Sequence, residues 1–210
     1  MRRAPSPHPP RRHRVGATFV AAVAAAAVLV ASPGPAAAEE LNGRLAVGLE
    51  QTLGGSSGLA LRYFFTEAVG LTTTLGVDLT LLGDGSGDIA TGLNGSLGLA
   101  VHFARSLHAH LGIGLRANLG WKSETAAKLA DENATSGILQ FSLEVPLFLE
   151  FFLSEHFSVG AATGLLLSFV PDDGSVLAPA GAGGTTKAGA TGIGIGAGAV
   201  TATLSVLYYF

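Results

Sequence analysis

The chain has 210 residues, no cysteine, and 12 basic against 15 acidic residues, for a formal net charge of −3 at pH 7. A cysteine-free chain has neither disulfide bonds nor thiolate metal ligands. No basic patch accompanies this balance, which excludes a nucleic-acid-binding protein, because such proteins neutralise phosphates with lysine and arginine.

Residues 1–38 have the composition of an export leader. Five arginines in 1–14 precede a short apolar stretch over 17–31, and three alanines end at Ala38. We predict a cleavable signal peptide over 1–38 and one mature domain over 39–210. The apolar stretch is short for a membrane-spanning helix, which needs about 20 apolar residues, although a retained anchor is an alternative. Removing the leader takes away five arginines and no acid, so the net charge moves from −3 to −8.

From residue 45 onward, apolar side chains recur at every second position. In 69–81 one alternate set is Val and Leu with a single Thr, whereas the other set is Gly, Thr and Asp. A period of two indicates a β-strand with one apolar face. The same pattern predicts eight strands, in chain order 45–49, 59–63, 69–81, 93–103, 111–121, 139–151, 157–169 and 200–210.

The connections between these strands alternate in length. The hairpin units 58–67, 98–106 and 146–155 align without gaps, and each crosses a tight turn. The longer connections contain 54–57, 83–88, 122–136 and 171–190, and we expect a short helical or irregular excursion over 122–136. Short turns on one side and longer loops on the other are typical of outer-membrane barrels, with the short turns in the periplasm.

Aromatic residues are sorted by strand end. Tyr63, Phe103, Phe151 and Phe157 lie beside the short turns, and Trp121 and Phe169 beside the long loops, as in the two aromatic girdles of a membrane barrel. A lipocalin-like barrel is the soluble alternative, but it places apolar side chains inside. Here the bulky apolar set belongs outside, because an eight-stranded interior is only just wide enough for side chains to fill it. We therefore predict an all-β fold, an eight-stranded antiparallel transmembrane β-barrel.

The last strand is the most specific segment. Leu204, Val206, Tyr208 and Phe210 resemble the C-terminal assembly signal of the small eight-stranded outer-membrane β-barrel proteins of the OmpA and OmpX type. The resemblance implies a location in the cell outer membrane, reached through the periplasm, among outer-membrane lipid and lipopolysaccharide. It also implies barrel-assembly machinery and periplasmic chaperones as partners during biogenesis. Two features depart from the ideal: Pro146 predicts a bulge, and the isoleucines of 192–198 are out of phase with the strand that follows.

The inward positions carry charges of both signs. We predict a lumen charge network of Arg44, Glu50, Arg62, Asp78, His102, Arg116, Glu144 and Glu150. Buried charges must be paired or wetted, so these residues would form either a plug or a narrow water path with an ion-pair gate. The small bore favours the plug.

The sequence gives weaker support to a catalytic site and a metal site. His156 and Ser158 with Glu155 suggest a lipid A-modifying enzyme, but the other hairpin units repeat no such set, so we predict no catalytic residue and no cofactor. His102, His108 and His110 lack the spacing of a metal site, and we predict none. The acidic residues of 84–88 resemble the start of a calcium-binding loop, but the bidentate Glu of such a loop is missing. Whether these acids bind divalent cations is left open by the sequence.

The predicted function is a structural or surface-interaction role in the outer membrane, with a mostly plugged polar lumen. A narrow passive pore for small solutes is the alternative, and a lipid A-modifying enzyme is the third hypothesis.

Overall fold

The computed structural model describes residues 40–82, 88–130, 136–177, 189–195 and 203–210. All of the described residues belong to one compact unit, Gly34–Phe210. The predicted signal peptide over 1–38 lies outside the described residues.

Nine strands and a short helix make up the described part of the chain. The strands are β1 (Leu45–Gln51), β2 (Ser57–Phe64), β3 (Val69–Leu81), β4 (Ile89–Arg105), β5 (Ala109–Lys122), β6 (Ile138–Ser154), β7 (Phe157–Phe169), β8 (Thr191–Ile195) and β9 (Thr203–Tyr209). The helix α2 (Glu124–Ala130) lies in the predicted excursion between β5 and β6. No helix within the described ranges is long and apolar enough to span a membrane.

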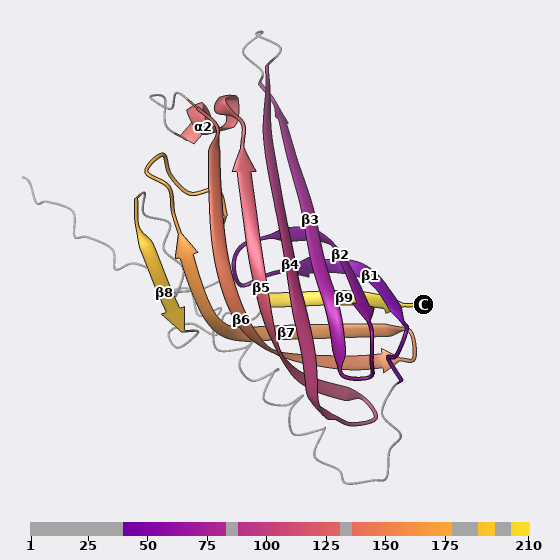
Figure 1. The fold of residues 1–210 in the computed structure, drawn as a ribbon. Helices are drawn as coiled ribbons and strands as arrows, with labels where there is room; N and C mark the ends of the chain where they lie inside the picture. Colours follow the sequence, from indigo (N-terminus) through magenta and orange to yellow (C-terminus); the bar gives the residue numbers. More distant parts are fainter. Residues whose placement is uncertain (1–39, 83–87, 131–135, 178–188, 196–202) are drawn as a thin grey trace, which may run out of the picture. The chain divides into compact units, whose positions relative to one another are not determined.

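The strands close into a ring. They pair antiparallel in the order β6-β5-β4-β3-β2-β1-β9-β7, and β7 pairs back to β6 (Figure 1). β8 and β9 share the eighth position, because β9 pairs with the first half of β7 and β8 with the second half. The predicted all-β fold, an antiparallel barrel of eight strands, is confirmed.

The inward and outward faces exchange between β8 and β9. Ala162 of β7 pairs with Thr203, and Leu165 pairs with Ile195. Between these two pairs β7 continues for three residues, whereas the chain from Ile195 to Thr203 continues for eight. The difference of five is odd, so even-numbered residues face inward in β8 and outward in β9. Ile193 is accordingly 81% exposed while Thr203 is 5% exposed, which confirms the predicted phase difference.

The exterior of the barrel is apolar. On each long strand the alternate leucines, valines and aromatics are exposed, as for Leu115 at 58% and Leu139 at 59%, while their sequence neighbours point inward. Side-chain alternation along a pleated strand produces this division directly.

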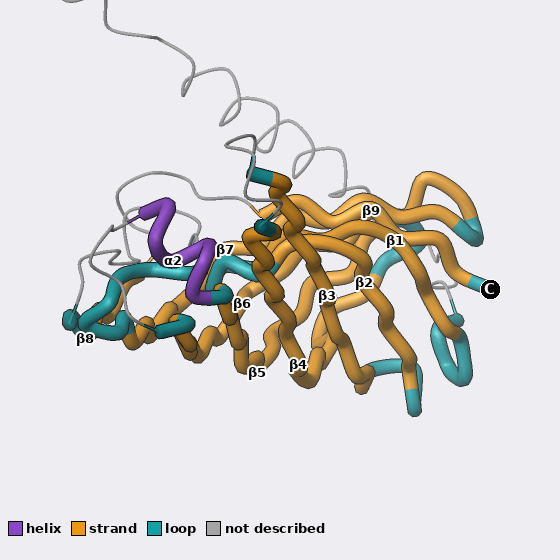
Figure 2. Tube along the Cα trace, turned by 90° about the horizontal axis from the view of Figure 1, so that it is seen from above, coloured by secondary structure: helices purple, strands orange, loops and turns teal. Residues whose placement is uncertain are grey.

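Connection lengths differ between the two ends of the barrel. The turns 65–68, 106–108 and 155–156 form a short-turn end, whereas 82–88, 123–137 and 170–190 are longer. α2 and β8 lie at one end and the C-terminus at the other (Figure 2). The connection 52–56 is short as well, unlike the longer loop expected there.

Pro146 produces no bulge. Ile113 pairs with Leu147 and Arg116 with Glu144, so the register between β5 and β6 is unchanged across the proline. The predicted bulge is therefore wrong, since the missing N–H only interrupts the ladder there. Register shifts occur instead between His102 and Ala104 and between Phe152 and Ser154, near the short-turn end.

Candidate functional site

Among the described residues, five buried Arg and Glu side chains point into the lumen. Glu50, Arg62, Arg116, Glu144 and Glu150 come from β1, β2, β5 and β6, and each residue is at most 8% exposed. They occupy the strand positions opposite in phase to the apolar exterior, so the barrel closure alone brings them together.

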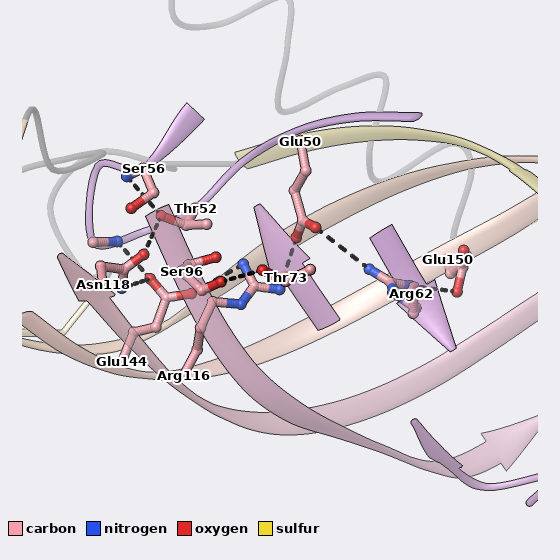
Figure 3. Close-up of polar contacts among 11 residues, drawn as sticks. Glu50, Thr52, Ser56, Arg62, Thr73, Ser96, Arg116, Asn118, Glu144 and Glu150 are labelled. Carbon is pink, nitrogen blue, oxygen red and sulfur yellow. Dashed lines mark hydrogen bonds and ion pairs between the residues drawn. The ribbon is translucent and has the colours of Figure 1, made fainter. Parts of the chain in front are cut away.

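Ion pairs connect these five residues into a series in which acidic and basic side chains alternate. Arg62 Nη1 lies 2.9 Å from Glu150 Oε2, and Arg62 Nη2 lies 3.8 Å from Glu50 Oε2 (Figure 3). Arg116 Nη2 lies 2.8 Å from Glu50 Oε1, and Arg116 Nη1 lies 3.2 Å from Glu144 Oε1. We call this series, Glu150–Arg62–Glu50–Arg116–Glu144, the charge ladder. Each guanidinium has a carboxylate on both sides, which compensates the cost of removing it from water.

Glu150 ends the ladder toward the short turns. Its Oε1 accepts hydrogen bonds from Ser158 Oγ at 2.6 Å and from Tyr209 Oη at 2.7 Å. His102 Nε2 lies 3.7 Å from its other oxygen. Through these partners Glu150 connects β2, β6, β7 and β9. Hydrogen bonds to a carboxylate are stronger than those between neutral groups.

Glu144 ends the ladder at the turn between β1 and β2. Its Oε2 accepts hydrogen bonds from Gly54 N at 2.5 Å and Asn118 Nδ2 at 3.2 Å, and Asn118 Oδ1 accepts one from Thr52 at 2.7 Å. Ser142 donates to the carbonyl of Gly54. The turn 52–56, which we call the inserted turn, thus reaches across the lumen behind β4 and β5 (Figure 1).

The inserted turn depends on glycine. A Cβ on Gly54 would collide with the side chains of Asn118 and Ser142, and Gly55 has a φ of 97° that favours glycine. Thr52, Leu53 and Ser56 are buried with it. The loop expected here on sequence grounds is therefore packed inside the barrel.

An apolar layer fills the lumen at the short-turn end. It consists of Leu41, Ala46, Ala60, Phe64, Phe152, Leu207 and Tyr209, each at most 3% exposed. The carboxylate of Glu67 accepts the backbone N–H groups of Leu41 and Asn42 and pairs with Arg105 at 2.9 Å. The residues just before β1 are thereby held in the mouth of the barrel.

The loop after β7 enters the opposite end. Gln140 Oε1 accepts hydrogen bonds from Val176 N at 2.6 Å, Leu177 N at 2.7 Å and Ser175 Oγ at 3.1 Å. Lys122 donates to the carbonyl of Ser175. These contacts fix residues 175–177 against the inner face of β5 and β6.

Three of the predicted network residues lie apart from the ladder or beside it. Arg44 lies at the short-turn end, where it contacts His156 Nδ1 at 2.9 Å and the carbonyls of Tyr209 and Phe210. Asp78 is exposed, because β2 pairs with β3 only as far as Leu75 and does not extend alongside Asp78. His102 is buried beside the end of the ladder, in contact with the ring of His110.

The residues considered for catalysis and metal binding are separated. Ser158 is buried and bonded to Glu150, whereas His156 lies exposed at a turn and contacts Arg44. His108 lies near Phe151, away from the buried pair of His102 and His110. No group of three or more His, Asp or Glu suited to a metal ion occurs among the described residues.

The predicted girdle residues lie near the ends of the strands. Tyr63, Phe103, Trp121 and Phe169 are exposed, and Phe151 and Phe157 are half-buried. Phe169 stacks on Phe141 beside the long loops. In the last strand Leu204, Tyr208 and Phe210 are exposed and Val206 is half-buried, so these four share the outward face of the segment that joins β1 to β7.

Comparisons with known proteins concern the fold. The sequence matches no protein-family model and no curated protein. It is similar in structure to the N-terminal β-barrel domain of Pseudomonas aeruginosa OprF, at 14% identity and a TM-score of 0.44, over 80% of this chain and 96% of that one. It is also similar to Ail, the attachment invasion locus protein of Yersinia pestis, at 14% identity and a TM-score of 0.36, over 80% and 99%. The strand pairing itself establishes the closed ring.

The chain has the fold of a closed antiparallel β-barrel of eight strand positions. Relative to the sequence prediction, the structure adds the inserted turn, Ser158, Tyr209 and Gln140 to the lumen of this barrel. Strand phase alone places Ser158 and Tyr209 inward. No local signal marks the inserted turn, because its direction depends on Asn118, Ser142 and Glu144 on distant strands.

Proposed function

We propose that this chain is an integral outer-membrane barrel protein with an occluded lumen and a structural or surface-interaction role, and that it catalyses no reaction. The observation that carries the proposal is the division of side chains between the two faces of one closed sheet. Leucine, valine and aromatic side chains face outward, and the charge ladder faces inward.

Lipid is the solvent that suits this exterior. Each apolar side chain left in water costs on the order of 25 cal/mol per Å² of exposed apolar area, and the exposed apolar positions follow every long strand. A closed barrel satisfies its backbone hydrogen bonds internally, as a hydrocarbon environment requires. The long strands exceed the about 9–11 residues that a tilted strand needs to cross a bilayer.

Three structural features of the lumen support occlusion. The charge ladder crosses the bore between β2, β1, β5 and β6. The inserted turn lies beyond its Glu144 end, and the apolar layer around Phe64 and Phe152 lies beyond its Glu150 end. A solute would have to displace all three to pass.

Conductance across a planar bilayer tests the proposal. The purified mature protein, with insertion verified by flotation with lipid vesicles, should give no steady current in 1 M salt. A steady ohmic current from the inserted protein would contradict the occlusion and favour the narrow passive pore. A mature protein that remains monomeric in the detergent-free soluble fraction would contradict the membrane location.

The partners expected from the resemblance belong to the same proposal. We expect outer-membrane lipid and lipopolysaccharide to surround the exterior, and barrel-assembly machinery and periplasmic chaperones to act before insertion. Depleting the assembly machinery in cells should leave the chain unfolded and sensitive to protease, whereas normal folding under depletion would contradict this route.

A further inference from the structure

The wall formed by β3 and β4 presents hydroxyl groups to the lumen. Thr72, Thr74 and Ser96 are 2%, 0% and 6% exposed, and their side-chain oxygens have no hydrogen-bond partner among the described residues. A buried hydroxyl without a hydrogen-bond partner destabilises the folded protein. Three such groups on one patch of wall therefore call for an occupant that can hydrogen-bond to them.

The strand register places this patch beside the charge ladder. Thr72 pairs with Arg62 across β2 and β3, and Thr74 pairs with Ser96 across β3 and β4. Side chains directly opposite on one face have Cβ atoms about 4.5–5.5 Å apart. The Nε atoms of Arg62 and Arg116 and the Oε2 atom of Glu50 are also buried, and the described part of the chain offers them no hydrogen-bond partner.

A glycine lies in the same row, in close contact with Arg116. Gly98 of β4 pairs with Thr72 on one side and Arg116 on the other. The patch therefore combines hydroxyls, guanidinium donors and a carboxylate acceptor on adjacent strands, with Arg116 packed directly against Gly98. A buried water molecule characteristically makes about three hydrogen bonds to groups of these kinds.

We propose that the lumen beside β3 and β4 is a hydration site, where bound water molecules bridge Thr72, Thr74 and Ser96 to Arg62, Arg116 and Glu50. Water completes the hydrogen bonding of the charge ladder on the side where no protein group within the described ranges does so. The inference goes beyond the occluded barrel proposed above, because an occluded lumen can be dry or wet at its centre.

Replacing threonine by valine distinguishes a wet wall from a dry one. Valine has the shape of threonine without the hydroxyl, so T72V and T74V remove the bridges with little change in packing. If water bridges these groups, each variant should raise the unfolding equilibrium constant about tenfold, measured by urea unfolding of the vesicle-inserted mature protein. T80V, at an exposed position of the same strand, is the control for the change in β-propensity.

The sign of the effect decides the outcome. A dry wall would make T72V and T74V equal to or more stable than the parent, because an unsatisfied hydroxyl is removed, and this result would overturn the inference. As a second measurement, NMR of the folded protein in micelles should show magnetisation transfer from long-lived water to the methyl groups of Thr72 and Thr74. Absence of that transfer would overturn it too, whatever the conductance of the barrel.

Discussion

Within the described structure, Glu150 accepts contacts from Arg62, Ser158, Tyr209 and His102 in the lumen. Its two oxygens receive Arg62 Nη1, Ser158 Oγ and Tyr209 Oη at 2.6–2.9 Å. Arg62 has a second, longer contact to Glu50 at 3.8 Å. Without the Glu150 charge, that longer contact would be the one remaining ion pair of Arg62 among the described residues, inside a barrel where Arg62 is 5% exposed.

Glu150→Gln should destabilise the barrel strongly. The substitution keeps the size of the side chain but removes the charge that compensates Arg62, and breaking a buried pair costs about 3–5 kcal/mol. Urea unfolding of the vesicle-inserted protein measures the loss. Glu155→Gln, at an exposed turn position, is the matched control and should change stability by less than about 0.5 kcal/mol. Equal effects of the two variants would show that Glu150 does not stabilise the ladder.

Gly54→Ala should destabilise the protein by about 1–3 kcal/mol, the usual cost of overpacking. The added methyl group would collide with Asn118 and Ser142, which hold the inserted turn. Gly92→Ala is the control, because a Cβ there meets Asp78 at 3.4 Å, an ordinary contact. If Gly54→Ala is as well tolerated as Gly92→Ala in the same unfolding measurement, the turn does not lie in the lumen.

At the scale of the element, β9 has two faces with different tasks. Its inward residues Leu207 and Tyr209 are buried in the apolar layer, and Tyr209 donates to Glu150. Its outward residue Tyr208 is 46% exposed and belongs to the pattern that resembles an assembly signal. The inward face therefore stabilises the folded barrel, and we propose that the outward face meets lipid or the assembly machinery.

Tyr209→Phe should lower the free energy of unfolding by about 1.5–3 kcal/mol, since it removes a buried hydrogen bond to a charged group. Tyr208→Phe should change it by less than about 0.5 kcal/mol, because no hydrogen bond involves its exposed hydroxyl in the described structure. Both variants keep the aromatic ring, so differences in assembly do not confuse the comparison. An unfolding midpoint for Tyr208→Phe as low as that for Tyr209→Phe would contradict the assignment of the stabilising hydroxyl to the inward face.

The elements differ in how far the sequence could predict them. The strands follow from a period of two in residues such as Val69, Leu71 and Leu75, because each strand buries or exposes alternate side chains locally. Proximity of Glu50, Arg62 and Arg116 also follows once the barrel closes. The inserted turn does not follow, because Thr52, Gly54 and Ser56 are equally suited to an exposed loop. Its direction is set by contacts with β4, β5 and β6, and these contacts have no local sequence signature.

At the scale of the whole molecule, the barrel reverses the usual distribution of polarity. Charges such as Arg116 and Glu144 are inside, and leucines such as Leu97 and Leu115 are outside. This arrangement is stable only if the surroundings of the barrel are less polar than its lumen. The surroundings can therefore be tested directly by placing a charge on the outer surface at two heights.

Leu115→Arg and Leu139→Arg make this test. Both leucines are exposed to a similar extent, but Leu115 lies at the middle of β5 and Leu139 pairs with Trp121 near the long-loop end. In a bilayer, an outward arginine costs about 2–4 kcal/mol at the midplane and about 0–1 kcal/mol near the interface. Unfolding in vesicles should therefore show a large loss for Leu115→Arg and a small one for Leu139→Arg. Two small losses of equal size would mean that the outer face meets water rather than hydrocarbon at both heights.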